Sequence, residues 1–131
     1  MNYFTIMLSG LAARNELKLI DDCICPGQRV TYECTVVGGV VTVWSGTIME
    51  IDCEIILRHY IIYLNSYRTC NNGAVIGQGV EVNNNCFTSQ LTVLLTPDLN
   101  QRTIRCSVVT GDEIIAIGVA QLLFTTGSIK I

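Results

Sequence analysis

The chain has 131 residues, of which half are apolar and 15% are charged. One hydrophobic core serves about 100 to 200 residues, so this length predicts a single domain, and the composition excludes a disordered chain. The net charge of −3 arises from 8 basic and 11 acidic residues without a Lys/Arg run, which argues against nucleic acid as a partner.

Seven cysteines are far more than ordinary usage and predict an oxidising compartment, either secreted or at the cell surface. The alternatives are buried free thiols in a cytosolic protein and a zinc site. Cys23 and Cys25 lie two apart, no second close pair follows, and the chain's one histidine, His59, has no partner at ligand spacing. We therefore expect no metal and no other cofactor.

The ends of the chain are distinguished from its body. Met1–Ala13 has a short apolar run followed by small residues, which fits either a signal-peptide remnant or an extra strand. We assign residues 1–16 to an N-terminal segment, 17–125 to the domain and 126–131 to a tail. The longest mostly apolar stretch, Ile114–Phe124, is shorter than the roughly 20 residues that a membrane-spanning helix requires.

The first half of the domain shows the two-residue alternation of β-strands. In Arg29–Val37 apolar side chains alternate with polar ones, so one face is predicted to lie in the core. Val40–Ser45, which contains the only tryptophan, is a second predicted strand, and Thr47–Ile51 resumes the alternation. Ile55–Tyr63 is strand-like but apolar on both faces.

The second half ends in three further predicted strands. Asn65–Asn85 is rich in Asn and Gly, which favours loops and short edge strands. Thr88–Thr96, Arg102–Val109 and Ile114–Thr125 follow as strands separated by turns. No window has a helical period of apolar positions, so the sequence predicts an all-β sandwich or barrel.

Three residues give this pattern a more specific meaning. Cys34 faces the predicted core in mid-strand, Trp44 follows ten residues later, and Cys106 faces the core of the second-last strand. These positions resemble the B-strand cysteine, C-strand tryptophan and F-strand cysteine of the immunoglobulin superfamily, and Leu91 resembles its E-strand leucine. The segments CPGQRVTYECTVVGG, TVWSG and TIRCSV more narrowly resemble immunoglobulin-like domains of sponge and cnidarian surface proteins.

The resemblance implies a two-sheet, Greek-key, variable-type sandwich of eight or nine strands with a Cys34–Cys106 disulfide between strands B and F. It also implies that Trp44, Leu91 and Ile104 belong to the core. One departure is that Ile104 stands where the family has the tyrosine of its tyrosine corner, and Asn100 stands where it has an acidic residue. We expect Asp98 or Asn100 to cap backbone amides in that turn instead.

Five cysteines remain, at positions 23, 25, 53, 70 and 86, and they allow fifteen arrangements of two bridges. We favour Cys53–Cys70, because these two residues bracket the polar middle segment. One of the other three is expected to be unpaired or to bond another chain.

Catalysis is not expected. His59 lies within an apolar strand, and neighbouring acidic residues such as Asp21 and Asp22 point to opposite faces of a strand, which does not suit paired carboxylate chemistry. No phosphate-binding glycine loop or nucleophile motif is present in the sequence. We predict that the protein is not an enzyme.

Binding is better supported, because a two-layer sandwich cannot cover both faces of the Ile55–Tyr67 stretch without extra strands or a partner. Aromatic and Arg side chains dominate interface hot spots. The candidate interface residues are Arg58, Tyr60, Ile61, Tyr63, Tyr67 and Arg68. Loops near Gly38–Val40, Asn65–Asn72 and Thr110–Glu113 are further candidates.

The predicted function is recognition or adhesion at the cell surface, as a receptor part that binds a protein partner, either homophilic or heterophilic. The alternative is a spacer domain without a ligand in a larger receptor or matrix protein. An exposed apolar patch favours binding, whereas a uniformly polar surface favours the spacer.

Overall fold

A computed structural model describes residues 14–38, 41–58, 67–83 and 85–124. Within these ranges it contains nine strands, two short 3₁₀ turns and no α-helix, which confirms the all-β prediction. The strands are β1 (Glu16–Leu19), β2 (Arg29–Val37), β3 (Val41–Ser45), β4 (Ile55–Arg58), β5 (Tyr67–Cys70), β6 (Val75–Asn83), β7 (Cys86–Leu94), β8 (Thr103–Thr110) and β9 (Glu113–Gln121). The turns are η1 (Asn71–Gly73) and η2 (Pro97–Leu99).

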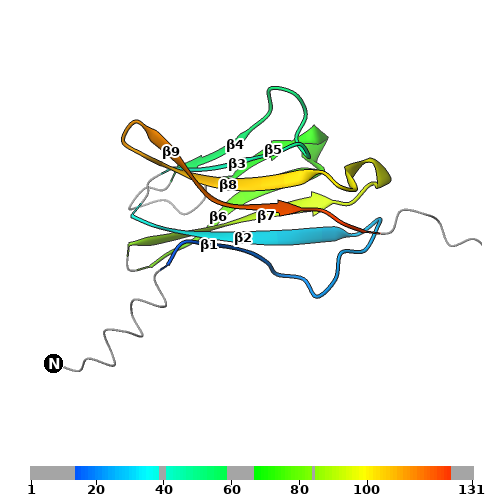
Figure 1. The fold of residues 1–131 in the computed structure, drawn as a ribbon, viewed down its shortest axis with the longest axis horizontal. Coiled ribbons are helices and arrows are strands. Elements are labelled where there is room, and N and C mark those ends of the chain that lie inside the picture. Colours follow the sequence, from blue (N-terminus) through cyan, green and yellow to red (C-terminus); the bar gives the residue numbers. More distant parts are fainter. Residues whose placement is uncertain (1–13, 39–40, 59–66, 84, 125–131) are drawn as a thin grey trace, which may run out of the picture.

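The strands form two antiparallel sheets that pack as a β-sandwich. The five-stranded sheet has the order β1-β2-β7-β6-β5, and the four-stranded sheet has the order β4-β3-β8-β9. In Figure 1, β8 and β9 lie above β2 and β1, and the chain passes between the layers three times among the described strands, after β2, β4 and β7. Two sheets and a sandwich are therefore as predicted.

Alternation along the strands builds the core. In β2 every second residue from Val30 to Val36 is buried, and β7 shows the same pattern. The register of β2 against β7 places Tyr32 opposite Leu91, so both strands present one face to the interior. Each buried apolar side chain adds roughly 1.5 to 3 kcal/mol of transfer free energy, which is the main driving force for this packing.

Two links join the sheets at the centre of the core. A disulfide connects Cys34 on β2 to Cys106 on β8, with a Cα–Cα distance of 6.5 Å. The indole Nε1 of Trp44 donates a hydrogen bond to Ser89 Oγ across the sandwich at 3.0 Å. Trp44, Leu91 and Ile104, the core residues expected from the sequence, are all fully buried.

The expectation of a strand at Thr47–Ile51 is wrong, because this stretch is a turn. Gly46 has a φ of 127°, which lies in the region that glycine tolerates, and the Met49 amide bonds back to its carbonyl. Asn71 then holds the turn: its side chain donates to the Ile48 carbonyl and accepts from the Glu50 amide, at 2.9 and 3.0 Å. A side chain from a distant segment therefore overrides the local alternation.

The middle segment is more regular than its composition predicts. β5 is the short edge strand that we expected, but β6 has nine residues and lies between β7 and β5. Gly77 is buried there, and a Cβ at that position would collide with Ile55 of the opposite sheet. The glycine therefore serves the close approach of the two sheets instead of a loop.

The turn before β8 uses one of the two expected caps. The Asn100 side chain accepts a hydrogen bond from the Phe124 amide at 2.9 Å, which ties the turn to the segment that follows β9. The Asp98 carboxylate instead accepts from the Thr96 hydroxyl, and this bond lowers the pKa of Asp98. Residues 1–13 and 126–131, assigned above to the N-terminal segment and the tail, lie outside the described residues.

Candidate binding face

The outward side of the four-stranded sheet is the candidate binding face. Strand registration arranges its side chains in rows, because residues paired across antiparallel strands point to the same side. The first row runs Arg58, Val41, Val109, Ile114; the second runs Ile56, Val43, Ser107, Ala116; the third runs Ser45, Arg105, Val119. We call these eleven residues the apolar face.

The apolar face carries no acidic side chain, and most of its members are aliphatic. Its two central valines, Val41 and Val43, are only 9% exposed, whereas the edge strands expose Ile114 to 70%, Val119 to 54% and Ile56 to 39%. A sheet face turned to water normally carries polar side chains. The aliphatic rows therefore depart from the side-chain pattern of a solvated sheet face.

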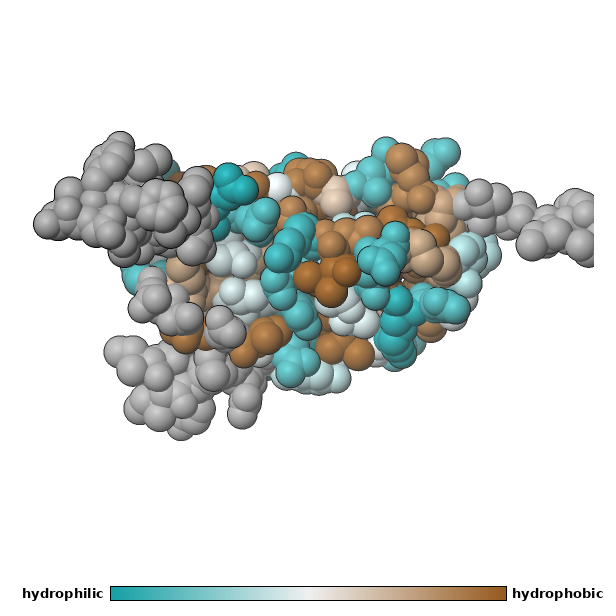
Figure 2. All heavy atoms as spheres, turned by 90° about the horizontal axis from the view of Figure 1, so that it is seen from below, coloured by the Kyte–Doolittle hydropathy of each residue, from teal (hydrophilic) through white to brown (hydrophobic). Residues whose placement is uncertain are grey.

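The outward side of the five-stranded sheet differs, and we call it the polar face. The hydroxyls of Thr31 and Thr92 lie 3.1 Å apart, and Thr35 and Thr88 form a second such pair at 3.3 Å. Between them, Glu33 accepts a hydrogen bond from Gln90 at 3.1 Å and pairs with Lys18 at 3.7 Å. Figure 2, which views the molecule from the side of β1 and β2, shows hydrophilic and hydrophobic side chains interspersed.

The structure describes three of the six interface residues predicted from the sequence. Arg58 ends β4, while Tyr67 and Arg68 begin β5, and these two strands contact each other at one side of the sandwich. All three are exposed, Tyr67 to 52%. Arg58 belongs to the apolar face, whereas Tyr67 and Arg68 lie on the neighbouring edge of the other sheet.

The remaining three, Tyr60, Ile61 and Tyr63, lie outside the described residues, and so does His59. The candidate loops are described in part: residues 39–40 and 65–66 fall outside, and Thr110–Glu113 forms the turn between β8 and β9.

Sequence reasoning did not single out Val109, Ile114 and Val119 as binding residues. The available signal was that Ile114–Thr125 is apolar on both faces, as Ile55–Tyr63 is. An edge strand pairs with one strand only, so fewer side chains surround the apolar residues on its outward side. Without the registration of β9 against β8, however, the outward members of the strand could not be named.

Two disulfides and three free thiols account for the seven cysteines. Cys53, in the connection before β4, is bonded to Cys70 at the end of β5, in addition to the Cys34–Cys106 bond. These are the two pairs that the sequence analysis favoured.

Cys23, Cys25 and Cys86 are free. A hydrogen bond with Cys25 raises the pKa of the exposed Cys23 thiol above its ordinary value. Cys86 pairs with Val37 at one end of β2, whereas Cys25 precedes the other end. Nine residues at about 3.3 Å each separate those ends, so an intramolecular bond between Cys25 and Cys86 is excluded in this fold.

Two further features of the described residues concern metal ions and membranes. In the described part of the chain, no three His, Cys, Asp or Glu side chains gather where they could hold a metal ion. Among the described ranges, no helix has the length and apolarity needed to cross a bilayer. No protein-family model matches this sequence, and a search of curated proteins finds no match.

Proposed function

We propose that the chain is an immunoglobulin-like, variable-type domain that recognises a second copy of itself outside the cell through the apolar face. The strand orders support the fold assignment: β1, β2, β7 and β6 take the places of strands A, B, E and D, while β4, β3, β8 and β9 take those of C′, C, F and G. The disulfide between β2 and β8 and the buried Trp44 on β3 agree with it.

Two features depart from the family pattern. β5 lies beside β6 in the five-stranded sheet, where a variable-type domain would place an additional strand in the other sheet. Ile104 fills the site of the missing tyrosine, and the Asn100 bond to Phe124 anchors the turn in its place. Neither departure disturbs the two central links between the sheets.

The extracellular assignment rests on the two disulfides. Such bonds persist in oxidising compartments and are rare in the cytosol. The same bonds would support a spacer domain equally well, so the apolar face carries the choice between the two functions.

The observation that carries the proposed function is the exposure of Ile114, Val119 and Ile56 around the two buried valines of β3. A two-fold dimer needs only one self-complementary patch, and a sheet face of aliphatic side chains meets that condition. Arg58 and Arg105 leave the face positively charged, so we expect their long side chains to reach solvent at the rim of the contact.

Sedimentation velocity over a range of concentrations tests the proposal. The expected result is a reversible monomer–dimer equilibrium that persists when accessible thiols are alkylated. Ile114→Lys should weaken it at least tenfold, because an ammonium group would be buried in a contact that already carries Arg58 and Arg105. Val80→Lys is the matched control, since Val80 is an exposed aliphatic residue of β6, outside the apolar face.

A chain that stays monomeric at every concentration contradicts homophilic recognition and supports the spacer. A dimer that alkylation abolishes assigns the association to Cys23, Cys25 or Cys86 and also contradicts the proposal. Equal weakening by Ile114→Lys and Val80→Lys would show that the contact lies elsewhere.

A further inference from the structure

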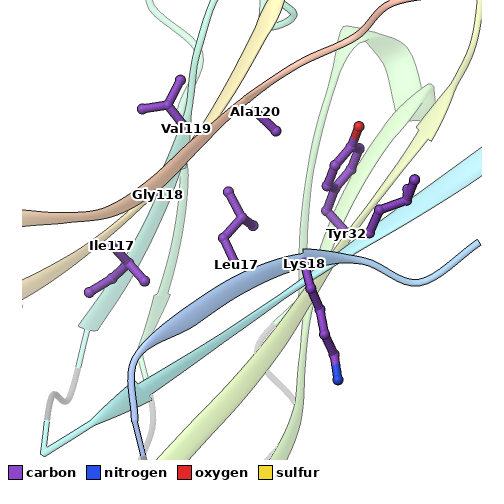
Figure 3. A pocket seen from close by; sticks show the side chains of 8 residues that line it. Leu17, Lys18, Tyr32, Ile117, Gly118, Val119 and Ala120 are labelled. Atoms are coloured by element: carbon purple, nitrogen blue, oxygen red, sulfur yellow. The ribbon is translucent and has the colours of Figure 1, made fainter.

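A cleft of about 260 Å³ opens between β1 and β9, where an end strand of one sheet meets an end strand of the other. It lies at a different side of the sandwich from β4 and β5. Its lining residues are Leu17, Lys18, Leu19, Tyr32, Ile117, Gly118, Val119 and Ala120. Figure 3 shows the strand carrying Leu17 and Lys18 below the cleft and the strand carrying Ile117 to Ala120 above it.

Small residues on β9 create this space. Gly118 and Ala120 pair with Cys106 and Ile104, so they point inward, and neither fills the volume that a larger side chain would take. At Gly118 the strands are in contact, because a Cβ there would lie 3.0 Å from the Leu17 Cβ. The cleft is therefore closed at Gly118 and open beside the neighbouring residues of β9.

Tyr32 supplies the one polar group of a side chain that reaches into the cleft. The residue is 4% exposed, and no hydrogen bond joins its hydroxyl to the described residues, but the oxygen is not among the fully buried polar atoms that lack a partner. Figure 3 shows the ring standing up from β2 with its oxygen directed toward the level of Ala120. The hydroxyl therefore opens on the cleft, where water or a ligand can form a hydrogen bond with it.

The cleft is electrically neutral. Lys18 lines it, but Figure 3 shows the Lys18 side chain pointing away, and its ammonium group pairs with Glu33 on the polar face. Burial raises the pKa of Tyr32, so the phenol stays protonated and can donate a hydrogen bond.

We propose that the β1–β9 cleft binds a neutral aromatic ring carrying one hydrogen-bonding oxygen, which pairs with the Tyr32 hydroxyl. An apolar cavity of about 150 Å³ accepts benzene, so this larger cleft has room for a substituted ring. The inference goes beyond the proposed self-recognition and does not depend on it, since Val119 is the one residue of the cleft lining given above that also belongs to the apolar face.

The test is a titration of the isotope-labelled, disulfide-bonded chain with p-cresol, followed by amide chemical shifts. Saturable shifts are expected at residues 17–19, 32 and 117–120. Toluene is the matched probe without the oxygen, and it should bind about three- to tenfold more weakly, as one net hydrogen bond predicts.

Three variants separate the parts of the site. Tyr32→Phe should weaken p-cresol by the same three- to tenfold and make it equal to toluene. Tyr67→Phe removes an exposed hydroxyl elsewhere and should change nothing. Ala120→Leu fills the cleft and should abolish saturable binding of both probes, while a dispersed amide spectrum verifies that each variant is folded.

Absence of saturable shifts with p-cresol in the folded chain overturns the inference, as do shifts that map outside the cleft. Equal binding of p-cresol and toluene to the unmodified chain overturns the role of Tyr32. N-acetyl-tyrosinamide distinguishes two sources of the same chemistry: binding as tight as that of p-cresol indicates a partner's tyrosine side chain, and exclusion indicates a free small phenol.

Discussion

The two outward faces of the sandwich follow the same alternation but differ in the side chains at their centres. On the polar face, Thr31 pairs with Thr92 and Glu33 pairs with Gln90, so each row satisfies its own hydrogen bonds. On the apolar face, Val41 and Val43 occupy the corresponding central positions. Because both sheets bury similar aliphatic side chains inward, folding requires only the inner set. The outward side chains are therefore the part of the sequence that distinguishes the polar face from the apolar face.

The largest expected effect comes from removing the link that holds both faces in place. Replacing Cys34 and Cys106 together by Ala should lower the free energy of unfolding by about 4 kcal/mol, because their sequence separation of 72 residues closes a long loop. The same change at Cys53 and Cys70, separated by 17 residues, should cost about 3 kcal/mol. Denaturant unfolding without reductant measures both, and a larger cost for the shorter loop would contradict this account.

Two threonines, one on the inner side of β3 and one on the polar face, extend the comparison between the two sheets. Thr42 is fully buried on the inner side of β3, and its hydroxyl has no hydrogen-bond partner in the described structure. Thr42→Val keeps the shape and should raise the free energy of unfolding by about 1 kcal/mol. Thr92→Val removes a hydroxyl that is paired on the polar face, and it should have no stabilising effect. Thermal unfolding compares the two, and stabilisation by Thr92→Val alone would show that the polar face is not satisfied.

The smallest expected effect concerns the charged pair of the polar face. Lys18 is largely exposed, so Lys18→Ala should change the free energy of unfolding by about 0.5 kcal/mol or less at low salt. The difference should vanish in 1 M salt, because exposed charges are screened there within about 3 Å. A loss that persists in high salt would mean that Lys18 contributes through packing on the polar face instead of through its charge.

Sequence alone determined the elements in which local pattern and tertiary packing agree. The limits of Arg29–Val37 are those of β2, because alternating apolar residues lie between a Pro–Gly turn and a glycine. The turn at Thr47–Ile51 could not be predicted, since Asn71 holds it from a different part of the chain.

The candidate site was only partly predictable for the same reason. Arg58 was identified because its stretch is apolar on both faces, whereas Ile114 and Val119 required the pairing of β9 with β8. The cleft depends on the separation between two strands of different sheets, β1 and β9, and no local pattern specifies that distance.

The positions of the free thiols limit how copies could be joined covalently. Cys25 precedes one end of β2 and Cys86 pairs with a residue at the other end. A free thiol therefore lies near each end of this strand. A bond between Cys25 of one copy and Cys86 of the next leaves an unreacted Cys86 at one end of the product and an unreacted Cys25 at the other. The same bond can therefore form again, which gives a linear polymer. A bond between two Cys86 residues instead gives a symmetric dimer, and no larger product forms if Cys23 and Cys25 stay reduced. Oxidation that produces a ladder of sizes would thus show that thiols at both ends of β2 react, and a single doubled species would show that thiols at only one end react.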